Sequence, residues 1–334
     1  MEKAGAKRNR TLPFDDNVRR LIIILAVLLA VTAVTKSSAF VNLNNFQSIG
    51  KQLTEYGLMS LGMGICMISG GIDLSTVYVA NLSGICAGLI IQSAVPGNTV
   101  LGCLAALAVG AVCGLFNGVL ISYFHIPPML ATLGSYELFM GISVVLSGGS
   151  TVSVNGELEL LSGLAILNIP LPFLIFIAAT IILGLVMSGT KFGEQVYLTG
   201  TSEKAARFAG IHVKATVIKC YLVSGVLSGM AGLISLSRLN SAKADFGTSY
   251  TMQTILVAVL GGINPNGGAG KIPGIAFSVI ILQILSSYLN QFPAISNYYR
   301  DLIWGAALLL VLVFNVEISR RPKKQRRKLN EPKE

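Results

Sequence analysis

The chain has 334 residues, of which 53% are hydrophobic and 12% are charged. With a mean hydropathy of +0.70, this composition excludes a water-soluble domain and predicts a membrane protein that crosses the bilayer several times. The net charge of +10 is concentrated at the two ends: residues 1–20 carry six Lys or Arg against three acids, and residues 318–334 carry eight against two. Basic flanks beside apolar helices are topology signals and contacts for anionic lipids, so they argue against nucleic-acid binding.

Ten apolar runs approach the length of about 20 residues that a membrane-spanning helix needs. In chain order they lie near 18–35, 53–69, 74–95, 99–122, 128–147, 170–188, 215–238, 250–262, 272–290 and 300–317. The eighth run is short and polar residues interrupt the third, so the count ranges from roughly eight to eleven. The sequence predicts an all-α, polytopic membrane protein with about ten transmembrane helices, in which residues 21–317 form a transmembrane domain between two basic tails.

The charge pattern also predicts the orientation. An even number of spans places both basic tails on one side, which the positive-inside rule makes the cytoplasm. The loop at 190–214 then lies inside and carries four basic side chains, Lys191, Lys204, Arg207 and Lys214. The loop at 147–169 lies outside and contains Glu157 and Glu159 but no Lys or Arg. Because the first apolar run lacks a small-residue cleavage site, we expect a retained helix rather than a signal peptide.

Many of the 36 glycines have the small-xxx-small spacing that lets helix backbones approach closely in lipid. Examples are Gly84–Gly88, Gly110–Gly114–Gly118 and Gly225–Gly229. We expect these glycines to lie at tightly packed helix interfaces.

Residues for catalysis, metal binding or phosphate binding are largely missing. The two histidines lie in short segments that are expected to be cytoplasmic, and the five cysteines lie in apolar runs without CxxC spacing. The segment 264–273, NPNGGAGKIP, superficially resembles a phosphate-binding loop, but it has Pro265 where a glycine is needed and Ile272 where a hydroxyl is needed. The sequence therefore predicts no catalytic residue, metal site or cofactor, and any ATP that drives this protein binds to another chain.

Six ionisable residues lie within the predicted spans or at their margins: Glu55, Asp73, Glu137, Arg238, Arg300 and Asp301. A charge in hydrocarbon costs about 2.5–3.5 kcal/mol on insertion scales, so each is a functional candidate. All except Asp73 and Glu137 lie near helix ends, where we expect them to reach interfacial water. Asp73 follows a glycine break, where it or Ser75 is expected to cap a helix. Glu137 lies about ten residues into the fifth span and is the most embedded acid.

Two classes of transporter remain open on these residues. An ion-coupled secondary transporter would use intramembrane acids as proton or sodium relays. A permease subunit that supplies only the pathway would take its energy from a soluble ATPase, which explains both the scarcity of buried charge and the long loop at 190–214. Within that loop the segment 202–210, SEKAARFAG, predicts a short amphipathic helix that Thr201 or Ser202 caps and Gly210 ends.

Five segments resemble, in the same order, the sugar-type permease subunits of bacterial ATP-binding cassette (ABC) importers, a group that includes ribose, arabinose and autoinducer-2 permeases. They are SGGIDLS at 69–75, FNGVLISYFHIPPMLATLG at 116–134, TKFGEQVYLTGTSEKAARFAGIHV at 190–213, VSGVLSGMAGLI at 223–234 and AVLGGINPNGGAGKIPG at 258–274. The resemblance covers roughly residues 40–315. Several ordered matches at similar spacing are far more specific than any one of them.

This resemblance implies an ABC importer permease fold in the bacterial inner membrane, with both termini cytoplasmic, and a translocation pathway for a monosaccharide or related small polar solute. The implied partners are a second permease subunit, in a homodimer or a heterodimer, an ABC ATPase subunit and an extracytoplasmic solute-binding protein. In this family the loop before the seventh span docks on the ATPase. The matching residues here are Glu203, Ala205, Ala206, Arg207 and Gly210.

A translocation pathway should hold its solute weakly, so we expect small hydroxyl or amide groups and few charges along it. The candidate pathway residues are Asp73, Ser75, Asn81, Asn117, Thr132 and Glu137. The chain departs from the family pattern at three places: Thr76 and Val77 replace the usual Val-Gly after Ser75, Met140 stands where an arginine often precedes Gly141, and Asn264, Pro265 and Asn266 interrupt the glycine-rich loop. These departures leave the solute and the choice of a second subunit open.

Overall fold

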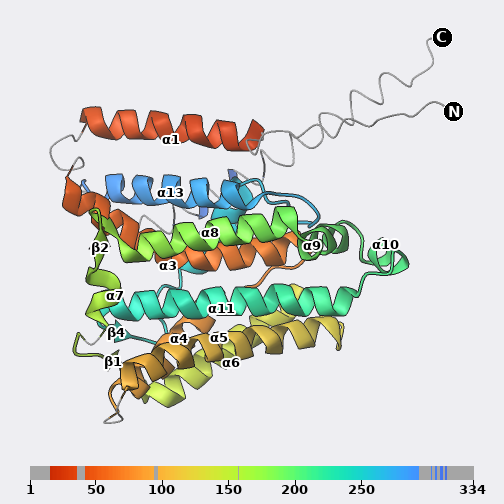
Figure 1. Ribbon diagram of the computed structural model, residues 1–334, viewed down its shortest axis with the longest axis horizontal. Helices are drawn as coiled ribbons and strands as arrows, with labels where there is room; N and C mark the ends of the chain where they lie inside the picture. The colour runs from red at the N-terminus through yellow and green to blue at the C-terminus, as the bar shows by residue number, and fades with distance from the viewer. Residues whose placement is uncertain are drawn as a thin grey trace.

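The computed structural model describes residues 16–35, 42–93, 97–156 and 158–292, together with positions 302, 305, 306, 309, 310 and 313. Its elements in chain order are α1 (Asp16–Thr35), α3 (Leu43–Ile68), α4 (Thr76–Ile91), α5 (Asn98–Ser122), α6 (Pro128–Ser147), β1 (Val152–Ser153), α7 (Glu159–Gly163), β2 (Ala165–Ile166), β3 (Ile169–Pro170), α8 (Leu171–Gly189), α9 (Lys191–Thr201), α10 (Glu203–Phe208), α11 (Val213–Leu239), β4 (Ser241–Ala242), α12 (Tyr250–Leu260) and α13 (Ile272–Leu289). The long helices run side by side as a bundle, and α10 protrudes from one end of it (Figure 1).

Within the described residues, six helices are long and apolar enough to cross a membrane: α1 from Asn17 onward, α5, α6, α8, α11 and α13. The apolar helices α4 and α12 are shorter, with 16 and 11 residues. Every predicted span from 18–35 to 272–290 corresponds to a helix, whereas most of 300–317, most of the first tail and all of the second lie outside the described residues. The chain is a polytopic helical membrane protein, and the predicted count of ten spans is not confirmed.

The start of α3 differs most from its prediction. The hydrophobic run predicts a helix from residue 53, but α3 begins at Leu43. Asn42 has extended backbone geometry, and its side-chain oxygen accepts a hydrogen bond from the Asn44 amide at 3.1 Å, which caps the helix. The first turns are rich in Asn and Gln, so hydropathy alone does not detect them.

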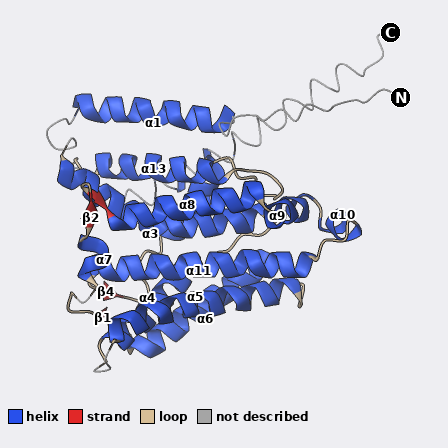
Figure 2. Cartoon of the chain, in the orientation of Figure 1, coloured by secondary structure: helices blue, strands red, loops and turns tan. Residues whose placement is uncertain are grey.

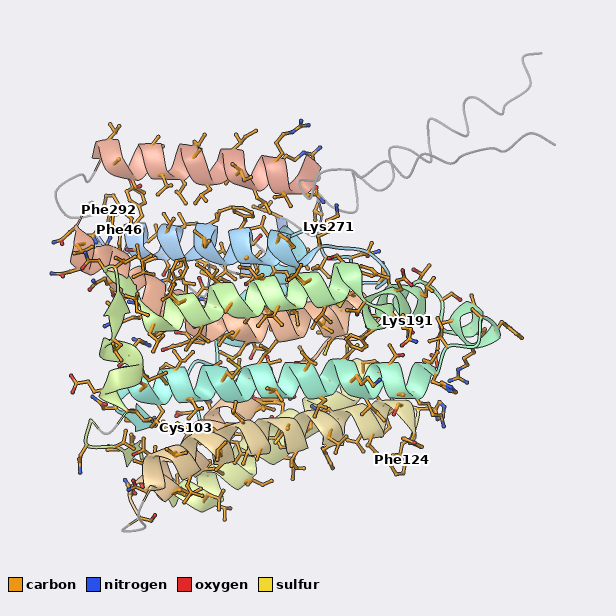
Figure 3. The ribbon with its side chains drawn as sticks, in the orientation of Figure 1. Phe46, Cys103, Phe124, Lys191, Lys271 and Phe292 are labelled. Carbon is orange, nitrogen blue, oxygen red and sulfur yellow. The ribbon has the colours of Figure 1, made fainter. Side chains whose placement is uncertain are left out.

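The two loops that the sequence places on opposite sides of the membrane do lie at opposite ends of the bundle. Phe124, Lys191 and Lys271 lie at the end that carries α9 and α10, whereas Phe46 and Cys103 lie at the other end (Figure 3). The strands lie at that other end (Figure 2). There β1 pairs with β4 in antiparallel register, with Val152 opposite Ala242, and β2 pairs with β3. These short pairings are a small departure from the all-α prediction.

Helix α11 lies at the centre of the bundle and packs on α3, α4 and α5. Its glycines make this packing close: a Cβ atom on Gly225 would overlap the carbonyl oxygen of Gly110, and one on Gly229 would lie 2.6 Å from the carbonyl oxygen of Ala106. On the other side, a Cβ on Gly232 would overlap the carbonyl oxygen of Ala80 in α4. The prediction that the spaced glycines lie at helix interfaces is confirmed for these positions.

Candidate functional site

The segment 69–75, SGGIDLS, joins α3 to α4 inside the bundle. Helix α4 begins after Ser75, whose own side chain does not cap it. The carboxylate of Asp73 holds Ser75 instead: its Oδ1 atom accepts hydrogen bonds from the Ser75 amide at 3.1 Å and from the Ser75 hydroxyl at 2.7 Å. The prediction that Asp73 or Ser75 caps the first amides of the helix is therefore wrong: Asp73 instead holds Ser75, the residue just before α4.

The same carboxylate connects this segment to two further helices. Its Oδ2 atom accepts a hydrogen bond from the Ser224 hydroxyl of α11 at 2.8 Å. The hydroxyl of Ser75 in turn accepts a hydrogen bond from the side-chain amide of Asn117 in α5, also at 2.8 Å. Asp73 is only 2% exposed, and the other three residues are fully buried. These four side chains form a buried network, here called the Asp73 network, that joins the start of α4 to α5 and α11.

The remaining pathway candidates occupy three different environments. Thr132 in α6 donates a hydrogen bond to the Ile72 carbonyl at 3.0 Å, so it adjoins the Asp73 network. Asn81 in α4 points instead to the loop after β4, where its amide donates to the carbonyls of Ala244 and Phe246 at 3.0 and 2.8 Å. Glu137 lies midway along α6 with an exposed side chain. The structure thus gathers Asp73, Ser75, Asn117 and Thr132, but neither Asn81 nor Glu137.

The loop at 190–214 folds into two helices, α9 and α10. The Ser202 hydroxyl accepts a hydrogen bond from the Ala205 amide at 3.3 Å, so Ser202 is the cap of α10, and Gly210 follows the helix with a positive φ of 79°. Glu203 and Arg207 form an ion pair one turn apart at 2.5 Å. The predicted short helix is therefore confirmed, within one or two residues at each end.

The side chains of α10 are unevenly buried. Ala206 packs inward and is 1% exposed, whereas Glu203 and Arg207 lie on the surface. Phe208, which the sequence analysis did not single out, is 93% exposed at the end of the helix. The sequence does place this aromatic residue directly after Arg207 in the 190–214 loop, and aromatic residues and Arg are enriched at protein interfaces.

Helix α9 rests directly on the end of α3 and on the loop between α12 and α13. A Cβ atom on Gly200 would overlap the Ile68 carbonyl oxygen and would lie 2.6 Å from the Gly268 amide nitrogen. That amide donates a hydrogen bond to the same Ile68 carbonyl at 2.9 Å. Three of the segments that resemble the permease family, 69–75, 190–213 and 258–274, therefore meet at one place.

A second contact ties α9 to the same loop. The hydroxyl of Tyr197 donates a hydrogen bond to the Gly270 carbonyl at 2.7 Å. Burial raises the pKa of Tyr197, which keeps its hydroxyl protonated as a donor. Beside this junction lies an open, polar cavity of about 400 Å³. It is lined by residues 69–71, the turn between α5 and α6, residues 199–203, Lys214, Tyr221 and Asn266.

At the opposite end of the bundle, Glu55 and Arg238 form an ion pair between α3 and α11. Besides its contact through Nε, Arg238 donates from a second guanidinium nitrogen to Glu55 Oε2 at 3.1 Å. Glu55 is fully buried, so the expectation that it reaches interfacial water is wrong: helix α3 continues outward past it, and it lines a small cavity together with residues of the loop before α12. Arg300 and Asp301 lie outside the described residues, as does Glu157.

Comparison with known proteins is consistent with this arrangement. A family model described as "Branched-chain amino acid transport system / permease component" matches residues 46–312. The autoinducer 2 import system permease protein LsrD of Photorhabdus luminescens is 33% identical over 264 residues, which cover 77% of this chain and 78% of that protein. LsrD proteins of Escherichia coli (strain K12) and Shigella flexneri are each 34% identical over 264 residues, which cover 77% of this chain and 79% of theirs. No solved structure matches the chain.

The chain therefore belongs to the family of sugar-type ABC importer permeases. As in that family, it is a multi-pass protein of the inner membrane and a transporter subunit rather than an enzyme.

Proposed function

We propose that this chain forms half of the translocation pathway of an ATP-driven importer for a monosaccharide or a related small polar solute. A separate ATPase subunit supplies the energy, and an extracytoplasmic binding protein delivers the solute. The names of the relatives, which refer to autoinducer 2 import, support a small solute of this kind. The observation that carries the proposal is the packing of Gly200, in α9, on Ile68, at the end of α3. Gly200 lies just before α10 along the chain, and Ile68 lies just before the segment that contains Asp73. The contact therefore connects the exposed helix α10 to the Asp73 network.

The docking surface for the ATPase is α10. Glu203, Ala206 and Gly210 set its shape: the ion pair and the glycine fix its two ends, and the buried alanine anchors it. Ala205, Arg207 and Phe208 are exposed and provide the contact. In interfaces, an aromatic residue and an arginine close together are the side chains that most often carry the binding energy.

Movement of the ATPase reaches the pathway through backbone contacts rather than through flexible side chains. A shift of α9 moves the end of α3 and the loop at Gly268, because glycines leave no side chain between these backbones. The segment 69–75 follows, and its Asp73 carboxylate passes the movement to Ser224 in α11. Close-packed elements transmit such displacements because they have few intermediate arrangements.

The pathway itself lies between this chain and the second permease subunit. Of the six candidate pathway residues, Glu137 has an exposed side chain and the other five are buried. We therefore assign Asp73, Ser75, Asn117 and Thr132 to support of the 69–75 segment, and Asn81 to support of the loop after β4. The outer face of α6, which carries Glu137, is the part of this chain that borders the pathway.

The end of the bundle that carries α9 and α10 faces the cytoplasm in this proposal. Its basic residues include Lys191, Lys204, Arg207 and Lys214, in agreement with the positive-inside rule. Both termini then also lie in the cytoplasm, and the strands face outward toward the binding protein.

The experiment that tests this function is an ATPase assay on the complete importer in liposomes. We expect Arg207→Glu to abolish solute-stimulated hydrolysis while leaving membrane insertion intact. The exchange of both charges, Glu203→Arg with Arg207→Glu, keeps the ion pair within α10 but should not restore stimulation, because the ATPase still meets the wrong charge. Stimulation that survives Arg207→Glu, or solute uptake by the purified chain alone along an ion gradient, would contradict the proposal.

A further inference from the structure

The polar cavity beside the junction of α9 with α3 is large enough for a small molecule. Its volume of about 400 Å³ lies within the range of about 300–1,000 Å³ that small-molecule sites in proteins occupy. Its walls come from residues 69–71 after α3, the turn between α5 and α6, the end of α9, the first turns of α11 and the loop between α12 and α13. A molecule in this cavity therefore touches several elements that are far apart along the chain.

Three hydroxyl groups in the wall of this cavity lack a hydrogen-bond partner among the described residues. They belong to Ser122 at the end of α5, Thr199 in α9 and Tyr221 in α11. These residues are 7%, 5% and 1% exposed. A buried hydroxyl without a partner is costly, and most buried polar groups in proteins are hydrogen-bonded. Three such groups from three helices at one cavity indicate a site for a molecule that supplies the missing partners.

The surroundings of these hydroxyls also point to a ligand site. A threonine in a helix commonly donates to the carbonyl one turn earlier, as Thr201 does in α9 at 2.9 Å, whereas Thr199 in the same helix forms no such bond. A Cβ atom on Gly71 would overlap the hydroxyl oxygen of Tyr221, so this glycine gives the hydroxyl its place in the cavity wall. His125, in the turn between α5 and α6, has a φ of 57°, and strained backbone of this kind clusters at ligand sites.

The lining of the cavity indicates the chemical class of the ligand. Hydroxyl groups both donate and accept hydrogen bonds, as does the side-chain amide of Asn266, so they match a molecule that carries several hydroxyls. The exposed charges of Lys214 and Glu203, which also line the cavity, are opposite in sign and favour neither an anion nor a cation. Lys214 Nζ lies 4.7 Å from the centre of the Tyr123 ring, and Glu203 is paired with Arg207. A small, uncharged, polyhydroxylated molecule such as a monosaccharide fits best.

We propose that this cavity is a regulatory site that binds a small, uncharged, polyhydroxylated molecule from the cytoplasm and that, when occupied, slows the transport cycle. The inference rests on the proposed function for the orientation of the chain and for the movement of α9. A molecule that bonds to Ser122, Thr199 and Tyr221 at once holds α5, α9 and α11 in their present arrangement. Because a ligand shifts a conformational equilibrium toward the arrangement that it binds more tightly, it opposes the shift of α9 that coupling requires. The imported solute belongs to the same chemical class, so its accumulation in the cell limits further uptake.

Binding of sugars to the purified chain in nanodiscs, without the ATPase or the binding protein, tests the site itself. The probes are D-ribose, D-glucose and glycerol, and saturation-transfer NMR detects weak binding. Cyclohexanol, a ring of similar size with a single hydroxyl, is the control ligand. We expect at least one polyhydroxylated probe to bind and cyclohexanol not to bind.

Removal of the three hydroxyls identifies the place of binding. The triple variant Ser122→Ala, Thr199→Val and Tyr221→Phe should raise the dissociation constant of the bound probe about tenfold or more, because it removes three hydrogen-bonding groups. Ser278→Ala is the matched control, since it removes a fully buried hydroxyl without a partner in α13, which does not line the cavity. It should leave the dissociation constant unchanged.

The stability of the triple variant is a control on this comparison. Its melting temperature should not fall, because none of the three hydroxyls loses a hydrogen bond to the described chain. If the triple variant is less stable, the single variant Tyr221→Phe replaces it and should still raise the dissociation constant about threefold or more.

ATP hydrolysis by the complete importer in nanodiscs, where both faces are accessible, tests the regulation. With the binding protein and its solute at saturation, addition of the sugar that binds the chain should reduce hydrolysis about twofold or more in the wild type and in Ser278→Ala. The triple variant should show the same rate before addition and no reduction after it.

Three results would overturn the inference: no binding of any polyhydroxylated probe, binding that the triple variant leaves unchanged, or hydrolysis that responds to the sugar equally in the wild type and the triple variant. A chain that binds no sugar would leave the importer function intact. An importer without solute-stimulated hydrolysis would contradict the proposed function, whereas the binding measurement on the chain alone would still stand.

Discussion

Asp73 accepts a hydrogen bond from the hydroxyl of Ser224 at 2.8 Å, and this contact joins the segment between α3 and α4 to the middle of α11. The other oxygen of the same carboxylate holds the first turn of α4 through Ser75. One buried side chain thus fixes the position of three helices relative to one another. The glycine contact between α9 and the end of α3 lies only a few residues away along the chain.

The first prediction concerns the Asp73 network. Ser224→Ala should lower the free energy of unfolding by about 1–3 kcal/mol, because it leaves one carboxylate oxygen of Asp73 buried without a donor. Ser228→Ala is the matched control: this serine lies one turn further along α11 and is fully buried, but its hydroxyl has no hydrogen-bond partner. It should be nearly neutral. Thermal or denaturant unfolding of the purified protein in detergent measures both, and equal losses would contradict the role assigned to Asp73.

The second prediction concerns the junction of α9 with α3. Gly200→Ala should destabilise the protein by about 1–3 kcal/mol or displace α9, because the added methyl group overlaps the Ile68 carbonyl. Gly184→Ala in α8, where an added Cβ meets nothing within 4 Å, should be neutral or stabilising by up to about 1 kcal/mol. Unfolding experiments report the stability, and protease sensitivity of the 190–214 loop reports the position of α9. A well-tolerated Gly200→Ala would show that the junction is looser than described.

The third prediction concerns Phe208. Because this side chain is 93% exposed, Phe208→Ala should leave the melting temperature of the isolated chain unchanged. It should weaken the ATPase contact by about 2 kcal/mol or more, roughly thirtyfold in the dissociation constant, if α10 is the docking surface. Leu185→Ala, an exposed apolar residue of the spanning helix α8, is the control and should not affect docking. Titration of the purified ATPase onto the chain in nanodiscs gives both affinities.

The fourth prediction concerns the buried ion pair of Glu55 and Arg238. Arg238→Ala should cost about 3–5 kcal/mol, because it leaves the fully buried Glu55 without a cation. The double variant Glu55→Met with Arg238→Met should cost much less than the single one, since no charge remains to be satisfied. Lys243→Ala, which breaks the exposed pair with Asp245, should change stability by about 1 kcal/mol or less. The comparison fails if the single and double variants are equally unstable.

Most of the correct predictions rest on local sequence patterns. The apolar runs locate the helices, and the polar 202–210 segment identifies α10, because a serine cap and a terminal glycine act within one turn. The glycine spacing likewise indicates that α11 packs closely on other helices, because glycines four residues apart lie on the same face of a helix. The contact of Asp73 with Ser75 is also local, since the carboxylate bonds to a residue two positions away, but it holds the residue before α4 and does not cap the helix as predicted.

The sequence patterns do not predict contacts between residues that lie far apart along the chain. Nothing near Glu55 indicates that Arg238, on a distant helix, lies against it, and this is why its burial was not expected. Likewise, Asn81 resembled a pathway residue because its type suits one, but its two hydrogen bonds go to a loop that folds back from beyond α11. The exposure of Phe208 depends on how α10 leaves the bundle, which only the three-dimensional arrangement shows (Figure 1).

The most direct test of the central claim is a photo-crosslink from α10 in the native membrane. Benzoylphenylalanine in place of Phe208 should form an adduct with a soluble protein that carries the Walker motifs of an ABC ATPase, and addition of ATP and solute should change its yield. If position 208 gives no protein adduct in membranes that still take up the solute, α10 is not the coupling element and the proposed mechanism is wrong.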